Sequence, residues 1–105
     1  MGAVARKGTD SVTTGHGCDT TVQILGGTAT VIVGGFPVAV VGDPLQAHTI
    51  TNPSPPPAPP CVPHLGQVIN AGSGSVLVGG KGIARVGDSA DLGSISTGYA
   101  TVIAG

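Results

Sequence analysis

The sequence predicts a small all-β protein, built from short strands and hairpins that repeat around a closed body. The stretch 31–43, VIVGGFPVAVVGD, returns almost unchanged at 76–88 as VLVGGKGIARVGD. Each copy has a β-branched run, paired glycines, a second β-branched run and a closing Gly-Asp, which is typical of a β-hairpin with a tight turn. No segment shows sustained helical periodicity.

A third copy of this hairpin is divided between the two ends of the chain. Residues 4–8 (VARKG) resemble residues 83–87 (IARVG), and residues 100–103 (ATVI) match residues 29–32. A hairpin divided in this way is complete only if the first and last strands pair. We therefore expect one domain over residues 1–105 with three hairpin-like sides and adjacent termini.

The composition allows only a modest core. The chain has 105 residues with 19 Gly and nine Pro, but only one Phe, one Tyr and no Trp. Its apolar mass comes from small and branched aliphatic residues. We expect such a chain to need a metal, a tight closure or a partner to hold its shape.

Charge and terminal sequence exclude several function classes. Four Lys and Arg against five acidic residues leave no basic surface for nucleic acid. The chain has no Glu, the commonest general base of zinc hydrolases. It begins MGAVARKGTD, without the apolar region of a secretory signal, and no run approaches the ~20 apolar residues of a membrane span. We expect synthesis in the cytoplasm without a signal peptide.

The connections between the hairpins are unlike one another. Residues 8–19 are rich in turn signals, with glycines on both sides of His16. Residues 20–24 are expected to form a short strand, which the Gly pair at 26–27 ends. Residues 52–63 contain seven prolines, which predict a stiff, extended loop.

After the proline-rich loop, residues 67–69 are expected to return to strand. The second complete hairpin follows. Residues 88–98 are then expected to form a short connection without metal ligands, leading to the closing strand.

The residues suited to metal binding all lie in these connections. They are three histidines and two cysteines: His16, His48, His64, Cys18 and Cys61. If the three sides converge, the loops after the Gly-Asp stops meet at one end of the body. Three imidazoles and one thiolate form a tetrahedral set that suits a structural zinc ion, with Zn–N near ~2.0–2.1 Å and Zn–S near ~2.3 Å. The sequence predicts Zn²⁺ bound by His16, His48, Cys61 and His64.

The source of the sulfur ligand has three interpretations. Cys61 is preferred because Cys-x2-His is a known ligand spacing and prolines hold it stiffly. Cys18 lies two residues from His16, and side chains at i and i+2 of an extended segment point the same way. A Cys18–Cys61 disulfide is the third interpretation, for a chain that matures in an oxidising compartment.

The glycines and aspartates of the repeat are interpreted as structural. The Gly pairs lack the Lys-Ser/Thr and the strand-loop-helix context of a phosphate-binding loop. The Gly-Asp stops at 42–43 and 87–88 are predicted to be turn devices whose carboxylates accept backbone N–H groups. We therefore predict no catalytic residue.

The repeated pattern resembles the PAAR-repeat family, the spike-tip proteins of contractile phage tails and type VI secretion systems. The resemblance covers Ala5–Asp10, Val31–Asp43, Val76–Asp88 and Ala100–Gly105, and is most like short stand-alone phage members. It implies a three-sided cone with pseudo-threefold symmetry, whose base sits on a trimeric β-helical spike. It also implies a vertex locked by a metal through three His and one Cys.

The resemblance can be carried over residue by residue at three positions. His16 and His48 stand at the family's positions after the Gly-Asp stops, and His64 matches the His that precedes the next strand. Many members have a Cys shortly after the last Gly-Asp. Here Leu92 stands at the expected place, so this comparison also points to Cys61 or Cys18 for sulfur.

The expected function is mechanical: a zinc-stabilised sharp tip that caps the spike, one copy per trimer, and helps it pierce a target membrane. The protein would belong to a virion baseplate or leave through a type VI machine. It would need no small-molecule substrate and no nucleic acid. The alternatives are a small zinc hydrolase, or a passive metal-stabilised adhesin or binding module.

Overall fold

The computed structural model describes residues 2–25 and 31–105, and these residues form short strands and no helix. The strands are β1 (Gly2–Val4), β2 (Ser11–Thr13), β3 (Thr21–Gln23), β4 (Ile32–Val33), β5 (Phe36–Pro37), β6 (His48–Thr51), β7 (Cys61–His64), β8 (Leu77–Val78), β9 (Lys81–Gly82), β10 (Ser89–Ala90), β11 (Gly93–Ile95) and β12 (Tyr99–Ala104). The predicted all-β class is confirmed. The predicted glycine break at 26–27 and the start of the repeat at 29–30 lie outside the described residues.

Three two-stranded units form the repeated hairpins. β4 pairs with β5 and β8 pairs with β9, each around two glycines with positive φ, which a tight hairpin turn requires. β1 pairs with β12, with Gly2 opposite Ala104 and Ala3 opposite Ile103. The predicted pairing of the first and last strands is confirmed, and it completes the divided hairpin.

A closed ring of hydrogen bonds relates the three copies. The N–H of Ala5 donates to Ala84 O at 2.9 Å, that of Ala84 to Ala39 O at 2.8 Å, and that of Ala39 to Ala5 O at 2.9 Å. All three alanines are fully buried. Each copy therefore donates to one neighbour and accepts from the other, which gives the body a pseudo-threefold axis with one buried alanine from each copy.

A second set of contacts follows the same symmetry. Gly8, Gly42 and Gly87 all have positive φ and donate N–H groups to Ile24, Ile69 and Ile95, at 2.8, 2.9 and 2.8 Å. The three isoleucines are the largest fully buried side chains of the core. The repeat thus sets one core isoleucine beside each copy, although the isoleucines lie outside the repeated motif.

The Gly-Asp stops act as turn devices, as predicted. The carboxylate of Asp43 accepts the N–H of Val40 at 2.8 Å, and that of Asp88 accepts the N–H of Arg85 at 2.8 Å. Asp10 does the same for Arg6 at 2.8 Å. Each carboxylate thus stabilises a turn at the end of a repeated segment, where the chain leaves the ring and enters a connecting loop.

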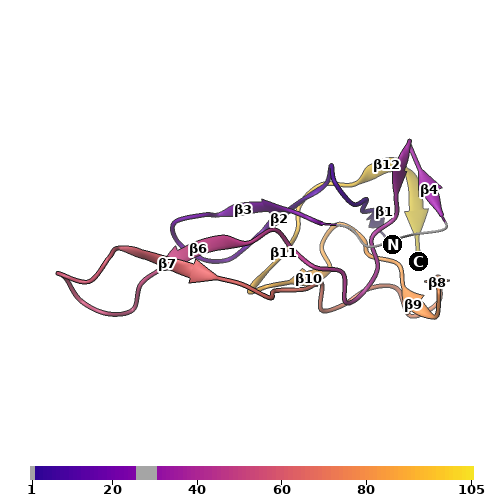
Figure 1. Ribbon diagram of the computed structural model, residues 1–105. Coiled ribbons are helices and arrows are strands. Elements are labelled where there is room, and N and C mark those ends of the chain that lie inside the picture. Colours follow the sequence, from indigo (N-terminus) through magenta and orange to yellow (C-terminus); the bar gives the residue numbers. More distant parts are fainter. Residues whose placement is uncertain (1, 26–30) are drawn as a thin grey trace.

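The molecule is elongated, with principal extents of 47 × 24 × 21 Å. The three hairpins and both termini gather at one end, and the β6–β7 hairpin extends to the other (Figure 1). Between them lies a four-stranded sheet in the order β10-β11-β2-β3. Among the described residues, no helix is long and apolar enough to cross a membrane.

Candidate metal centre

The four side chains of the candidate centre come from two structural units. His48 begins β6 and His64 ends β7, and the antiparallel register places them opposite each other. His16 lies in the β2–β3 loop and Asp91 in the β10–β11 turn. Because β2 pairs with β11, these two connections emerge at the same end of the four-stranded sheet. The N–H of Leu92 donates to Thr14 O at 3.2 Å, which joins them directly.

The four side chains converge on one point. One ligand atom from each, chosen among the imidazole nitrogens and carboxylate oxygens, lies within 4.8 Å of all the others. His16 Nε2 lies 2.7 Å from Asp91 Oδ1, and His48 Nε2 lies 2.8 Å from Asp91 Oδ2. His64 Nδ1 lies 3.2 Å from His48 Nε2 and 3.8 Å from Asp91 Oδ2. Bond lengths of ~2.0–2.2 Å to a tetrahedral metal separate neighbouring ligand atoms by roughly 3.3 Å, so small movements would accommodate an ion.

The tautomer of His48 follows from its surroundings. Its Nδ1 lies 2.9 Å from the carbonyl oxygen of Gln46, which can only accept, so Nδ1 of the neutral ring carries the proton. The lone pair of Nε2 therefore faces the other three ligands. A backbone carbonyl that fixes the second nitrogen in this way is a common feature of metal-binding histidines.

Asp91 Oδ2 is the least satisfied atom of the cluster. It is buried, and it has no hydrogen-bond partner within the described residues. His48 Nε2 stands 2.8 Å away, but with its proton on Nδ1 this nitrogen offers a lone pair rather than a donor. Two acceptors that face each other in a buried place are unfavourable unless a proton or a metal ion lies between them. The arrangement can therefore hold a metal ion.

The surroundings give Asp91 an unusual backbone. Its φ is 55°, in the left-handed region where Asp is tolerated better than most residues. It begins the two-residue turn between β10 and β11, and Asn70 Nδ2 donates to its carbonyl at 3.1 Å. The side chain is 1% exposed, as is that of His48, while those of His16 and His64 are 11% and 23% exposed. The carboxylate thus forms the inner wall of the cluster.

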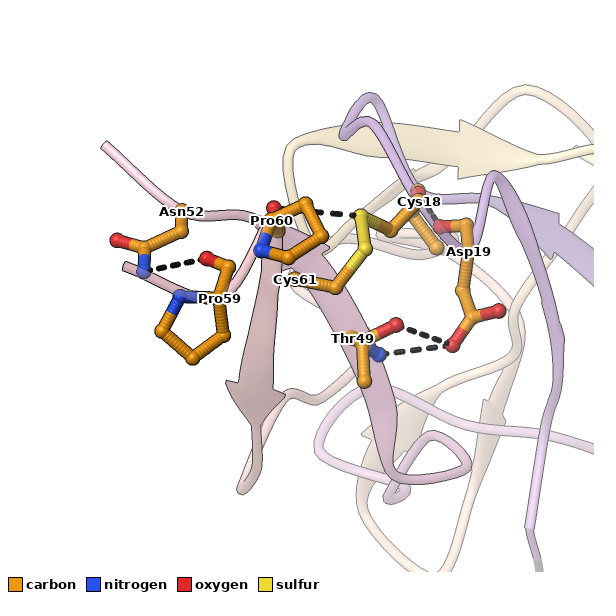
Figure 2. The surroundings of a disulfide bond; sticks show 8 residues. Cys18, Asp19, Thr49, Asn52, Pro59, Pro60 and Cys61 are labelled. Carbon is orange, nitrogen blue, oxygen red and sulfur yellow. Dashed lines mark hydrogen bonds between the residues drawn. A yellow bond between two sulfur atoms is a disulfide. The ribbon is translucent and has the colours of Figure 1, made fainter. Parts of the chain in front are cut away.

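The structure brings three of the four predicted ligands together and places the fourth elsewhere. Cys61 is bonded to Cys18 in a disulfide, with a Cα–Cα distance of 6.2 Å (Figure 2). The preference for Cys61 as the sulfur ligand, and the alternative of Cys18, therefore do not match the structure; the third interpretation does. The reason lies in the strand: residues three apart in β7 project to opposite faces, so Cys61 cannot share the face of His64.

Sequence reasoning missed Asp91. The prediction that residues 88–98 contain no ligand is wrong for this cluster. A signal was available, since the segments that follow Asp10 and Asp43 each contain a histidine, and Asp91 is the titratable side chain that follows Asp88 in the third copy. It stands one residue before Leu92, the position at which the family resemblance places a Cys.

Comparison with known proteins gives no family for the chain. No protein-family model matches it, and no curated protein matches it either.

Proposed function

We propose that this protein is a metal-stabilised tip that caps a trimeric β-helical spike of a contractile injection machine and helps it pierce a membrane. The observation that carries the proposal is the closed alanine ring with a hairpin on each of its three sides. A single chain with this symmetry can present three similar surfaces to the three chains of a trimer. The resemblance of the repeats to PAAR proteins supports the same conclusion.

The hairpin end carries exposed apolar side chains in equivalent positions of all three copies. Ile32, Leu77 and Ile103 are 58%, 57% and 51% exposed, and each belongs to a different hairpin. The residues before them form a second equivalent set: Val31, Val76 and Val102. Repeated exposed apolar side chains mark an interaction site better than scattered ones do. We propose that this end docks on the blunt end of the spike by apolar contact and strand addition, one copy per trimer.

The opposite end would be held by the metal. Three imidazoles and a carboxylate are suitable ligands for Zn²⁺, and four protein ligands leave no open position for water. We therefore propose zinc in a structural rather than catalytic role. The ion would join the β2–β3 loop, the β6–β7 hairpin and the β10–β11 turn. This arrangement favours a mechanical tip over a small zinc hydrolase.

The binding partner tests this proposal. The purified protein should form a complex with a trimeric β-helical spike protein, from a phage tail or a type VI machine, in a ratio of one to three by light scattering. Leu77→Asp should weaken binding at least about tenfold, because it buries a charge in the apolar contact. Ser54→Asp, which adds the same charge in the exposed loop beyond β6, should leave affinity unchanged.

Other outcomes would overturn the docking proposal. Three copies per spike trimer would show that the internal symmetry is not used. Absence of binding to spikes of both kinds would favour a passive metal-stabilised adhesin or binding module.

A further inference from the structure

The β2–β3 loop, residues 14–20, holds both a metal-cluster residue and a disulfide cysteine. His16 belongs to the cluster. Cys18 lies two residues after His16 in the loop and forms a disulfide with Cys61 of β7. Every residue from Gly17 to Thr20 is exposed. The loop therefore has little apolar burial to fix its position, and it depends on a few specific contacts.

Thr14 and His16 contact the β10–β11 turn, and the more exposed part of the loop contacts the β6–β7 hairpin. Asp19 Oδ2 accepts the N–H of Thr49 at 2.8 Å and its hydroxyl at 3.0 Å (Figure 2). The N–H of Asp19 donates to Thr49 O at 3.1 Å. A Cβ on Gly17 would lie 1.9 Å from Thr51 Oγ1, so the loop passes directly against β6. The loop thus follows the edge of the hairpin.

The disulfide and the metal cluster contact the β6–β7 hairpin on opposite faces. Cys61 begins β7 and His64 ends it, so their side chains leave opposite faces of the strand. Cys18 is bonded to Cys61 on one face. On the other face, the rings of His16 and His64 have centroids 4.7 Å apart. Two cross-links, one covalent and one through the ligand cluster, therefore join the same loop to the same strand.

We infer that the Cys18–Cys61 disulfide is a positioning cross-link for the metal centre, so that metal binding and the oxidation state of the cysteines are coupled. The inference rests on the metal site of the proposed function. With the disulfide intact, His16 is already held beside His64, and binding an ion costs little further ordering of the loop. Without it, the hydrogen bonds between Asp19 and Thr49 remain, and the ion must supply more of the ordering of the exposed loop.

The coupling is reciprocal because it is a free energy between two sites. Reduction breaks the S–S bond, takes up two electrons and two protons, and leaves two thiols. A bound ion that holds His16 beside His64 also keeps the two sulfurs close, so it favours the disulfide. The chain would bind metal more weakly in a reducing compartment than in an oxidising one, and the metal-bound protein would resist reduction by glutathione.

Metal affinity of three proteins tests the inference. Zn²⁺ is titrated against a chromophoric chelator into the oxidised protein, the Cys18→Ser/Cys61→Ser double variant, and Ala39→Val. The double variant should bind about tenfold more weakly, within the usual range of coupling between sites. Ala39→Val lowers stability at the alanine ring but changes no residue of the loop, the disulfide or the ligand cluster, so it should bind Zn²⁺ as the oxidised protein does. This control separates positioning of His16 from a general loss of stability.

Glutathione and cobalt complete the test. The ratio of reduced to oxidised glutathione needed to open the disulfide should rise when Zn²⁺ is bound. With Co²⁺ in place of zinc, the oxidised protein should show no thiolate-to-metal charge-transfer band.

The outcomes separate this inference from the proposed function. Equal Zn²⁺ affinity of the oxidised protein and the double variant would overturn the coupling and leave the metal site standing. A reduced protein that binds Co²⁺ as tightly as the oxidised one, with a thiolate band, would overturn it in favour of a sulfur ligand. An oxidised protein that binds no metal would overturn both the coupling and the structural zinc.

Discussion

The two ends of this molecule are held together in different ways. At the hairpin end, three nearly identical segments meet in a ring of backbone hydrogen bonds around Ala5, Ala39 and Ala84. At the other end, unlike loops meet through three histidines, one aspartate and a disulfide. The repeated sequence forms the first end, and the residues outside the repeat form the second.

This difference shows what each end requires. A ring that three copies share needs the same small residue in each copy, because a side chain larger than alanine would crowd the axis. The loops at the narrow end bury little apolar surface, so specific cross-links replace a core there. We therefore expect a perturbation at the ring to affect the whole molecule, and a perturbation at the cross-links to affect mainly one end.

Removal of the metal should have the largest effect. At a free metal concentration a thousandfold above Kd, binding contributes about 4 kcal/mol to stability, which a chelator would remove. In hydrogen exchange, the amides of β6, β7 and residues 14–20 should lose protection, while those of Ala5, Ala39 and Ala84 keep theirs. An unchanged melting temperature, or equal loss at both ends, would contradict the separation of the two ends.

Enlargement of the ring should have an intermediate effect. Ala39→Val adds two methyl groups at a fully buried position on the axis and should destabilise the fold by about 2 kcal/mol. Thermal unfolding followed by circular dichroism measures the loss, with Ala100→Val at an exposed position of β12 as the control. Equal melting temperatures for the two variants would mean that the ring tolerates larger side chains.

Substitution of Asp19 should have the smallest effect on stability, and that effect should depend on pH. The N–H and then the hydroxyl of Thr49 donate to its carboxylate and hold the pKa of Asp19 below its usual value. Since the folded-state pKa is the lower one, the stabilisation is present above the unfolded-state value of about 4 and is lost as pH falls through the folded-state pKa.

The comparison that measures this effect uses Asp19→Asn. With chelator in all samples, the melting temperatures of the two proteins should differ near neutral pH and approach each other in acid. A difference that grows in acid would contradict the role of the ionised carboxylate.

The sequence predicts the hairpin end well, because the information there is local and repeated. Paired glycines, β-branched runs and the Gly-Asp stops each have one structural interpretation, and the split copy requires β1 to pair with β12. The structure bears out both the pairing and the turn role of Asp43 and Asp88.

The ligand cluster was predicted only in part, because strand register decides it. Convergence of His16 and His48 follows from the symmetry of the loops, and the register of the β6–β7 hairpin adds His64. The Cys-x2-His spacing of Cys61 and His64 predicted a shared site. In strand β7, however, side chains three residues apart project to opposite faces, so the two residues are separated. Asp91 reaches the cluster through a two-residue turn and a left-handed backbone, which its position after Asp88 does not by itself specify.

X-ray absorption at the metal edge of the purified, oxidised protein tests the central claim most directly, together with elemental analysis. The account predicts one metal ion per chain, bound by nitrogen and oxygen alone, with loss of the ion in Asp91→Ala. A sulfur ligand in the first coordination shell, or full metal content in Asp91→Ala, would contradict it.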